Sequence, residues 1–358
     1  MSFPRVAVLG LLALMTACGT SDVGLAPEDT TTTSTTTTAA PATSTSTTST
    51  STSTSSTTTT TTTTTTVPEV LPELVVDETG VPVNGQTDGV LVSDTGWILP
   101  ILSGLDDDRH RVWTPCGRQA DIGGGRVIGT ADIVIDPGHG GSEPGAVGQG
   151  GLREADLNLD VAKKVRDAFV GAGYSVVMTR QTDVRVPIVT RAEIGQALDP
   201  VAFISIHFNA GTDAPSETPG TEMYFQIDNP ESRRLAGLLY EETRNVLDQY
   251  DIAWVALGDS GTLFRPNEAG GDYYGVLRRP APVLSVLAEY AYLSNPAEEE
   301  LVSDPAVQDE LAQATLTAFE RFVGTDDPGT GFVEEPIFRG FGPSGAGRTD
   351  NCTDPRLE

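Results

Sequence analysis

Two of the three histidines in this chain occupy matching positions after short apolar runs. His139 follows the run at residues 133–135, and His207 follows the run at residues 203–206. Runs of this kind form buried parallel strands. The carboxyl ends of such strands meet at the edge of the sheet where α/β proteins place their sites. Because a neutral imidazole nitrogen is the commonest metal ligand, the pair predicts a metal site.

Glu154 is a third candidate ligand. Apolar Leu157, Val161, Val165 and Phe169 follow it at helical spacing, so Glu154 is expected in the first turn of a helix. A glutamate there is also favourable simply as a negative charge near the helix amino end, and a lone histidine at a strand end is often structural. However, catalytic zinc sites commonly use two histidines and one carboxylate as ligands and leave the fourth position open.

Five segments occur here in a characteristic order: IVIDPGHGG, GLREADLNL, VVMTR, FISIHFNA and VLAEYAYLSN. Over roughly residues 131–324 the chain resembles the zinc-dependent N-acetylmuramoyl-L-alanine amidases of the third amidase class, which cleave bacterial peptidoglycan. The resemblance implies one Zn²⁺ per chain, bound by His139, Glu154 and His207. It also implies that Glu289, in the last segment, is the catalytic residue.

The position of Glu289 supports this role independently. Residues 283–287 read as another buried strand, so Glu289 emerges near a strand end. A carboxylate beside a zinc ion can take a proton from water and deliver it to a leaving nitrogen. The alternative is a surface carboxylate before a turn, of which Glu298, Glu299 and Glu300 are expected to be better examples.

The reaction implied by the resemblance is hydrolysis of the amide between N-acetylmuramic acid and the L-alanine of the stem peptide. Peptidoglycan is the expected partner, in cell-wall remodelling or daughter-cell separation. Two other functions stay open: a catalytically inactive peptidoglycan-binding protein and a zinc peptidase, both on the same scaffold.

Other polar residues near the motifs have expected supporting roles. Gly138 allows the turn to pass close to a metal. Asp136 either orients His139 or serves as a turn carboxylate. Arg180 and Arg191 are expected in structural ion pairs or caps rather than in substrate binding, and Asn209 is expected to line the cleft.

The amino-terminal segment predicts export. Residues 1–18 combine Arg5 with a short apolar run from Val6 to Met15 and end at Cys18, which is typical of a signal peptide with a lipobox-like cysteine. A lipid at Cys18 would anchor the protein to the outer face of the cytoplasmic membrane, whereas an ordinary signal peptide would release it. Residues 19–68, rich in threonine and serine, are expected to form a disordered linker.

Export also bears on Cys116 and Cys352, which are the cysteines that remain beside Cys18. In an oxidising compartment they can form one disulfide that ties the segment before the catalytic domain to the tail. An intermolecular bond is the alternative.

The apolar runs alternate with helical patterns, so the expected fold class is α/β. A mostly parallel twisted sheet should be flanked by helices on both faces. The expected parts after the linker are a small β extension at 69–130, the amidase domain at 131–324 and an irregular tail at 325–358. The formal net charge of −28 argues against nucleic acid as a partner, and a monomer is expected.

Overall fold

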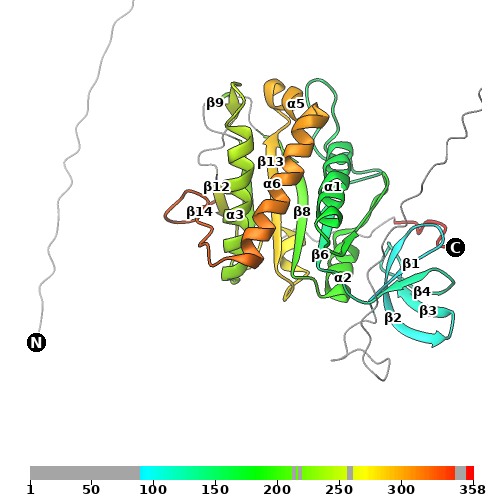
Figure 1. Cartoon of the computed structure of the whole chain (residues 1–358). Coiled ribbons are helices and arrows are strands. Elements are labelled where there is room, and N and C mark those ends of the chain that lie inside the picture. The colour runs from blue at the N-terminus through cyan, green and yellow to red at the C-terminus, as the bar shows by residue number, and fades with distance from the viewer. Residues whose placement is uncertain (1–88, 212–214, 217–219, 256–260, 343–351) are drawn as a thin grey trace, which may run out of the picture. The chain divides into compact units, whose positions relative to one another are not determined.

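The computed structural model describes residues 89–211, 215–216, 220–255, 261–342 and 352–358 (Figure 1). The predicted signal segment with its cysteine and the predicted linker lie outside the described residues. Within the described residues, no helix is long and apolar enough to cross a membrane.

A seven-stranded sheet forms the centre of the larger region, in the order β14-β12-β10-β13-β8-β6-β7. Neighbouring strands run parallel except at β10 and β13, which are antiparallel. This confirms the predicted mostly parallel sheet. The strands are β6 (Ile133–Pro137), β7 (Val176–Met178), β8 (Ala202–Asn209), β10 (Glu222–Phe225), β12 (Gly261–Phe264), β13 (Ser285–Tyr292) and β14 (Ile337–Phe338).

Helices cover both faces of this sheet. On one face α1, α3 and α6 lie side by side (Figure 1), and their apolar residues form one core with strand residues such as Ile204 and Val286. On the other face α2 and α4 pack against Val134, Phe203 and Leu287. The helices are α1 (Glu154–Gly171), α2 (Ile188–Leu198), α3 (Pro230–Leu247), α4 (Gly275–Arg278), α5 (Pro296–Ser303) and α6 (Pro305–Gly324).

A second, antiparallel sheet precedes the larger one, in the order β4-β3-β2-β1-β5. Side chains alternate between the faces of a strand. Val90 and Ile98 therefore join the core shared with α2, while the next residues, Leu91 and Leu99, join a small separate core. The strands are β1 (Val90–Val92), β2 (Ile98–Asp106), β3 (Arg109–Trp113), β4 (Gln119–Gly123) and β5 (Arg126–Ile128). We call this second sheet the small sheet.

The tail differs from the irregular segment that we expected. Its residues Ile337–Phe338 form β14, which pairs in parallel with β12 at the edge of the large sheet. A strand this short has too few residues to show a period, so the sequence pattern could not reveal it. A further two-stranded sheet joins β9 (Pro215–Ser216) to β11 (Trp254–Val255).

The end of the tail returns to the small sheet. Cys352 forms a disulfide with Cys116, from which it is separated by 236 positions. Beyond it, Asp354 accepts a hydrogen bond from the Cys116 backbone N–H at 2.8 Å, and Leu357 packs against the small core. The two cysteines thus pair within the chain, and the end of the tail packs against the small sheet.

Candidate metal and catalytic site

The two histidines meet at the carboxyl ends of neighbouring parallel strands. Pro137 at the end of β6 is in register with Ile206 of β8, so His139 and His207 come next to each other. Their ring centroids lie 5.0 Å apart.

Glu154 lies between the two imidazoles. It is the first residue of α1 and is buried. Its Oε2 atom lies 3.2 Å from His139 Nε2, and its Oε1 atom lies 2.9 Å from His207 Nδ1. One ligand atom from each residue falls within 4.8 Å of the others, so the structure brings together the three predicted ligands.

The charges in this cluster favour an ionised carboxylate. Burial opposes ionisation of Glu154, but hydrogen bonds and charge from His139 and His207 outweigh it and hold its pKa well below the usual value. Burial in turn lowers the pKa of His207, although its hydrogen bond to Glu154 acts in the opposite direction. Neutral imidazole and carboxylate are the forms that bind metals.

Two glycines allow the cluster to be this compact. A Cβ atom on Gly138 would lie 2.2 Å from the His207 ring, so any side chain there would displace the imidazole. A Cβ atom on Gly145 would lie 2.3 Å from Glu154 Oε2. Gly138 therefore allows the turn to pass close to the His207 ring, and Gly145, which the motifs did not single out, leaves room for the Glu154 carboxylate.

Glu289 faces the same cavity from the next strand. It is in register with His207 of β8 on one side and with Glu222 of β10 on the other. The cavity has a volume of about 310 Å³ and is lined by His139, His207 and Glu289 together with aromatic residues such as Tyr274.

The Glu289 carboxyl is poised to hold a proton. It is buried, and its Oε2 atom has no hydrogen-bond partner among the described residues. Burial raises its pKa well above the usual value, and the negative charges of Glu154 and Glu222 add to the effect. A cation bound nearby would act in the opposite direction and favour the carboxylate.

Asp136 supports the site in a different way from the one expected. Its carboxylate does not orient the His139 imidazole directly but pairs with Arg191 Nη1 at 2.6 Å. Arg191 Nη2 then donates to the His139 backbone carbonyl at 2.6 Å. Burial alone would raise the pKa of Asp136. The charge of Arg191 and the hydrogen bonds from Thr179 and Ser205 outweigh burial, so the pKa lies below its usual value.

Arg180 and Arg191 are structural in the expected sense. Arg180 donates to the backbone carbonyls of Pro137, Gly138 and Ala155 and so fixes the turn that carries His139. Arg191 also lies along the wall of the cavity. Asn209 was expected to line the cleft, but its side chain instead donates to Glu222 at 2.8 Å, and other described residues line the cavity.

One buried polar residue within the segment GLREADLNL was not singled out as a candidate. The Asn158 side chain donates to Glu154 Oε1 at 3.3 Å and to the Gly138 carbonyl at 3.1 Å. It is fully buried one turn after Glu154. A polar amide on the apolar face of a predicted helix, four residues after a candidate ligand, is the signal that could have found it.

The prediction that Glu298 and Glu299 are surface carboxylates is wrong, because both are buried. Glu299 accepts hydrogen bonds from the backbone N–H groups of Gly150 and Leu152, in the loop before Glu154. Glu298 accepts one from Tyr292 N at the end of β13. Both residues lie in the first turn of α5, where the helix dipole favours a carboxylate. Glu300 is exposed, as expected.

The fold and the site together define an α/β protein with a histidine–glutamate–histidine cluster at the strand ends. Residues 133–321, more than half of the chain, match the family described as N-acetylmuramoyl-L-alanine amidase. The chain belongs to the N-acetylmuramoyl-L-alanine amidase family. The small sheet and the disulfide lie outside the matched residues.

Individual relatives agree with this assignment. The chain is 31% identical over 223 residues to the N-acetylmuramoyl-L-alanine amidase AmiC of Neisseria meningitidis, an alignment covering 54% of this chain and 53% of that protein. It is 29% identical to the germination-specific N-acetylmuramoyl-L-alanine amidase of Bacillus subtilis, covering 53% and 78%. The chain thus spans about half the length of AmiC. Among solved structures, the amidase AmiC2 of Nostoc punctiforme is 27% identical, with 53% and 96% covered and a TM-score of 0.45.

Proposed function

We propose that this protein is a zinc-dependent N-acetylmuramoyl-L-alanine amidase that cleaves the amide between muramic acid and the L-alanine of the stem peptide. The observation that carries the proposal is the meeting of three candidate metal ligands beside a cavity that is also lined by Glu289, a buried glutamate whose Oε2 atom has no hydrogen-bond partner among the described residues. Membership of the amidase family supports the choice of amide bond.

The donor set fits zinc. His139 Nε2, His207 Nδ1 and a Glu154 oxygen are the ligand types of catalytic zinc sites. Glu154 is held for this role by the Ala146 backbone N–H, which donates to its Oε2 atom at 2.7 Å. When bound there, zinc supplies a Lewis acid that polarises the scissile carbonyl and makes water more acidic.

The chain's own residues manage the proton. Glu289 accepts a proton from the attacking water at a carboxylate oxygen while the water oxygen bonds to the carbonyl carbon. The carbon–nitrogen bond then breaks, and Glu289 passes the proton to the departing alanine nitrogen. Burial of the Glu289 carboxyl favours this transfer, because it keeps bulk water from competing for the proton.

The cellular setting is also part of the proposal. An exported chain tethered through a lipid at Cys18, or else secreted, would place a monomeric amidase domain next to peptidoglycan. A Cys18→Ala variant that still partitions into detergent and incorporates labelled fatty acid would contradict the lipid anchor.

The test is digestion of purified peptidoglycan with the zinc-loaded chain, followed by mass spectrometry of the released ends. An amidase yields free L-alanine amines paired with lactyl carboxylates. New termini within the stem peptide would indicate a zinc peptidase instead, and binding without cleavage would indicate an inactive peptidoglycan-binding protein.

The Glu289→Ala variant separates metal binding from catalysis. Loss of the proton carrier should lower kcat by about 10²–10⁴-fold, with zinc content near one ion per chain. His139→Ala and His207→Ala should lose both zinc and activity. Full activity in Glu289→Ala would refute the assigned role. Glu300→Ala, at an exposed glutamate, is the matched control.

A further inference from the structure

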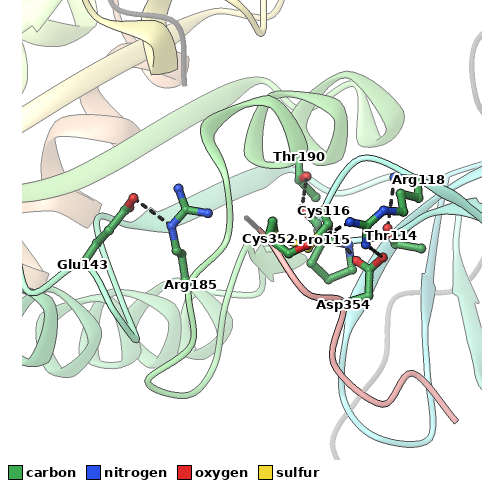
Figure 2. Close-up of a disulfide and its surroundings, with 9 residues drawn as sticks. All are labelled: Thr114, Pro115, Cys116, Arg118, Glu143, Arg185, Thr190, Cys352 and Asp354. Atoms are coloured by element: carbon green, nitrogen blue, oxygen red, sulfur yellow. Dashed lines mark hydrogen bonds and ion pairs between the residues drawn. A yellow bond between two sulfur atoms is a disulfide. The ribbon is translucent and has the colours of Figure 1, made fainter. Parts of the chain in front are cut away.

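A second, larger cavity lies between the small sheet, the tail and the loops of the amidase domain. We call it the disulfide groove. It has a volume of about 630 Å³, and Trp97, Ser142, Glu143, Arg185 and Thr353 line it together with the Cys116–Cys352 disulfide. Figure 2 shows the disulfide together with Glu143 and Arg185, which line the groove with it.

The disulfide groove adjoins the cavity lined by His139, His207 and Glu289, which we call the catalytic cavity. Glu143 lies four positions after His139 and lines both cavities. Arg185 holds it in place, with Nε donating to Glu143 Oε1 at 2.7 Å (Figure 2). Glu143 therefore marks the boundary between the two cavities, where a strand-like ligand bound at the candidate metal site would pass into the groove.

One wall of the groove comes from parts of the chain outside the family match at residues 133–321. Trp97 precedes β2 of the small sheet, and Thr353 belongs to the tail. This wall is firmly fixed to the amidase domain, because Thr190 of α2 donates to the Pro115 carbonyl at 2.8 Å and the disulfide secures the tail.

The lining suits an uncharged, hydroxyl-rich ligand. Trp97 is partly buried against the small core and presents its remaining surface to the groove. An indole face packs well against the C–H face of a sugar ring, and the exposed hydroxyls of Ser142 and Thr353 can hydrogen-bond to sugar hydroxyls. Glu143 and Arg185 neutralise each other, and the net charge of −28 disfavours an anionic ligand.

We propose that the disulfide groove binds the glycan strand of peptidoglycan, as a run of uncharged N-acetylated sugars next to the cleaved amide. This rests on the proposed amidase function. The catalytic cavity of about 310 Å³ holds the amide and its immediate surroundings, and the sugars further along the strand lie against Trp97. Binding energy from these remote sugars then favours long strands over short fragments.

The binding test uses the full-length chain and the β-1,4-linked tetramer of N-acetylglucosamine, which has the glycan backbone but no peptide. The indole N–H signals of the three tryptophans are followed by NMR, with Trp97→Leu identifying the signal of Trp97. The Trp97 signal should shift saturably, whereas that of buried Trp254 should not. An unmoved Trp97 signal would overturn the proposal.

A second variant fills the groove without touching the core. Thr353→Tyr should weaken tetramer binding by about 10-fold or more, because its ring occupies the space beside the indole. Thr317→Tyr, at an exposed threonine of α6, is the matched control and should bind as the unmodified chain does. Equal affinity in both variants would contradict binding in the groove.

Cleavage kinetics then test the link to catalysis. The ratio of kcat/KM on long peptidoglycan strands to kcat/KM on a single muramoyl peptide should fall about fivefold or more in Thr353→Tyr. An unchanged ratio would overturn the groove as a glycan subsite. Displacement of the bound tetramer by free stem peptide would also overturn it, because the groove would then bind peptide rather than glycan. If the unmodified chain cleaves neither substrate, the amidase function fails, whereas the tetramer titration still decides the groove.

Discussion

The catalytic cavity and the small sheet are held together by different means. Around the cavity, a continuous sheet and buried charged groups fix the side chains, as with the pair of Asp136 and Arg191. The small sheet has a core of five buried residues and depends on a disulfide and on Leu357 from the distant tail. Small cores often need such covalent support. The comparison teaches that the geometry of the candidate site is built into the large sheet, whereas the groove wall is attached to that sheet.

Breaking the buried ion pair should have the largest effect on stability. Arg191→Met leaves the Asp136 carboxylate buried without its cation, which should lower the free energy of unfolding by about 3–5 kcal/mol. Denaturant unfolding followed by circular dichroism measures this change. The matched control is Arg111→Met in the small sheet, where the pair with Asp121 is exposed and its loss should change little. Similar losses of unfolding free energy in both variants would contradict the conclusion that buried charged groups matter more around the cavity than in the small sheet.

Removing the disulfide should act mainly on the other region. The double variant Cys116→Ser/Cys352→Ser should destabilise the small sheet by about 2–4 kcal/mol, because the unfolded chain is no longer constrained. Amide hydrogen exchange should speed up in β1–β5 and in residues 352–358, with β6 and α1 unchanged. Uniform acceleration along the chain would show that the two regions unfold as one.

A smaller effect is expected within the site itself. Asn158→Ala removes the amide that fixes Glu154 Oε1, so zinc affinity should fall by about 10–100-fold. Competition with a chromophoric chelator gives the affinity. Asp160→Ala, at an exposed position of the same helix, should bind zinc normally. Unchanged affinity in Asn158→Ala would show that the backbone N–H of Ala146 suffices to hold the carboxylate.

Much of the site region was predictable because its signals are local. The helix expected after Glu154 spans Glu154–Gly171, since its apolar residues repeat at helical spacing. The strand ends that carry His139 and His207 follow from apolar runs. Their approach to Glu154 then follows from parallel topology, because consecutive strand ends meet at one edge of the sheet.

What the sequence could not show depends on contacts between distant segments. Glu299 looked like a surface residue because its partners, the N–H groups of Gly150 and Leu152, lie about 150 positions earlier in the chain. Asn209 was assigned to the cleft because it lies two positions after His207 and so on the same face of the strand, but its amide donates to Glu222 instead. Its partner Glu222 becomes visible only once β10 is paired with β13.

The smallest expected effect concerns α2, which contacts both the small sheet and α4. Glu193 of α2 is partly buried, and its Oε2 atom has no hydrogen-bond partner among the described residues. Burial raises its pKa from 4.5 to about 7, although Arg279 opposes the shift. The folded state therefore binds more protons than the unfolded state between these two pH values, so the free energy of unfolding falls as the pH rises through this window and levels off above it.

Glu193→Gln should remove this pH dependence, because the amide stays neutral in both states. Denaturant midpoints measured at intervals from pH 4.5 to pH 7.5 would show a shallower slope in the variant than in the unmodified chain. Exposed Glu300→Gln is the control and should keep the original slope. A slope retained in Glu193→Gln would place the titrating group elsewhere. Amide hydrogen exchange in β1 and β2, measured over the same pH range, tests whether α2 passes the effect to the small sheet. If Glu193→Gln changes the pH dependence of exchange only in these strands, the two regions are coupled through α2 as well as through the disulfide.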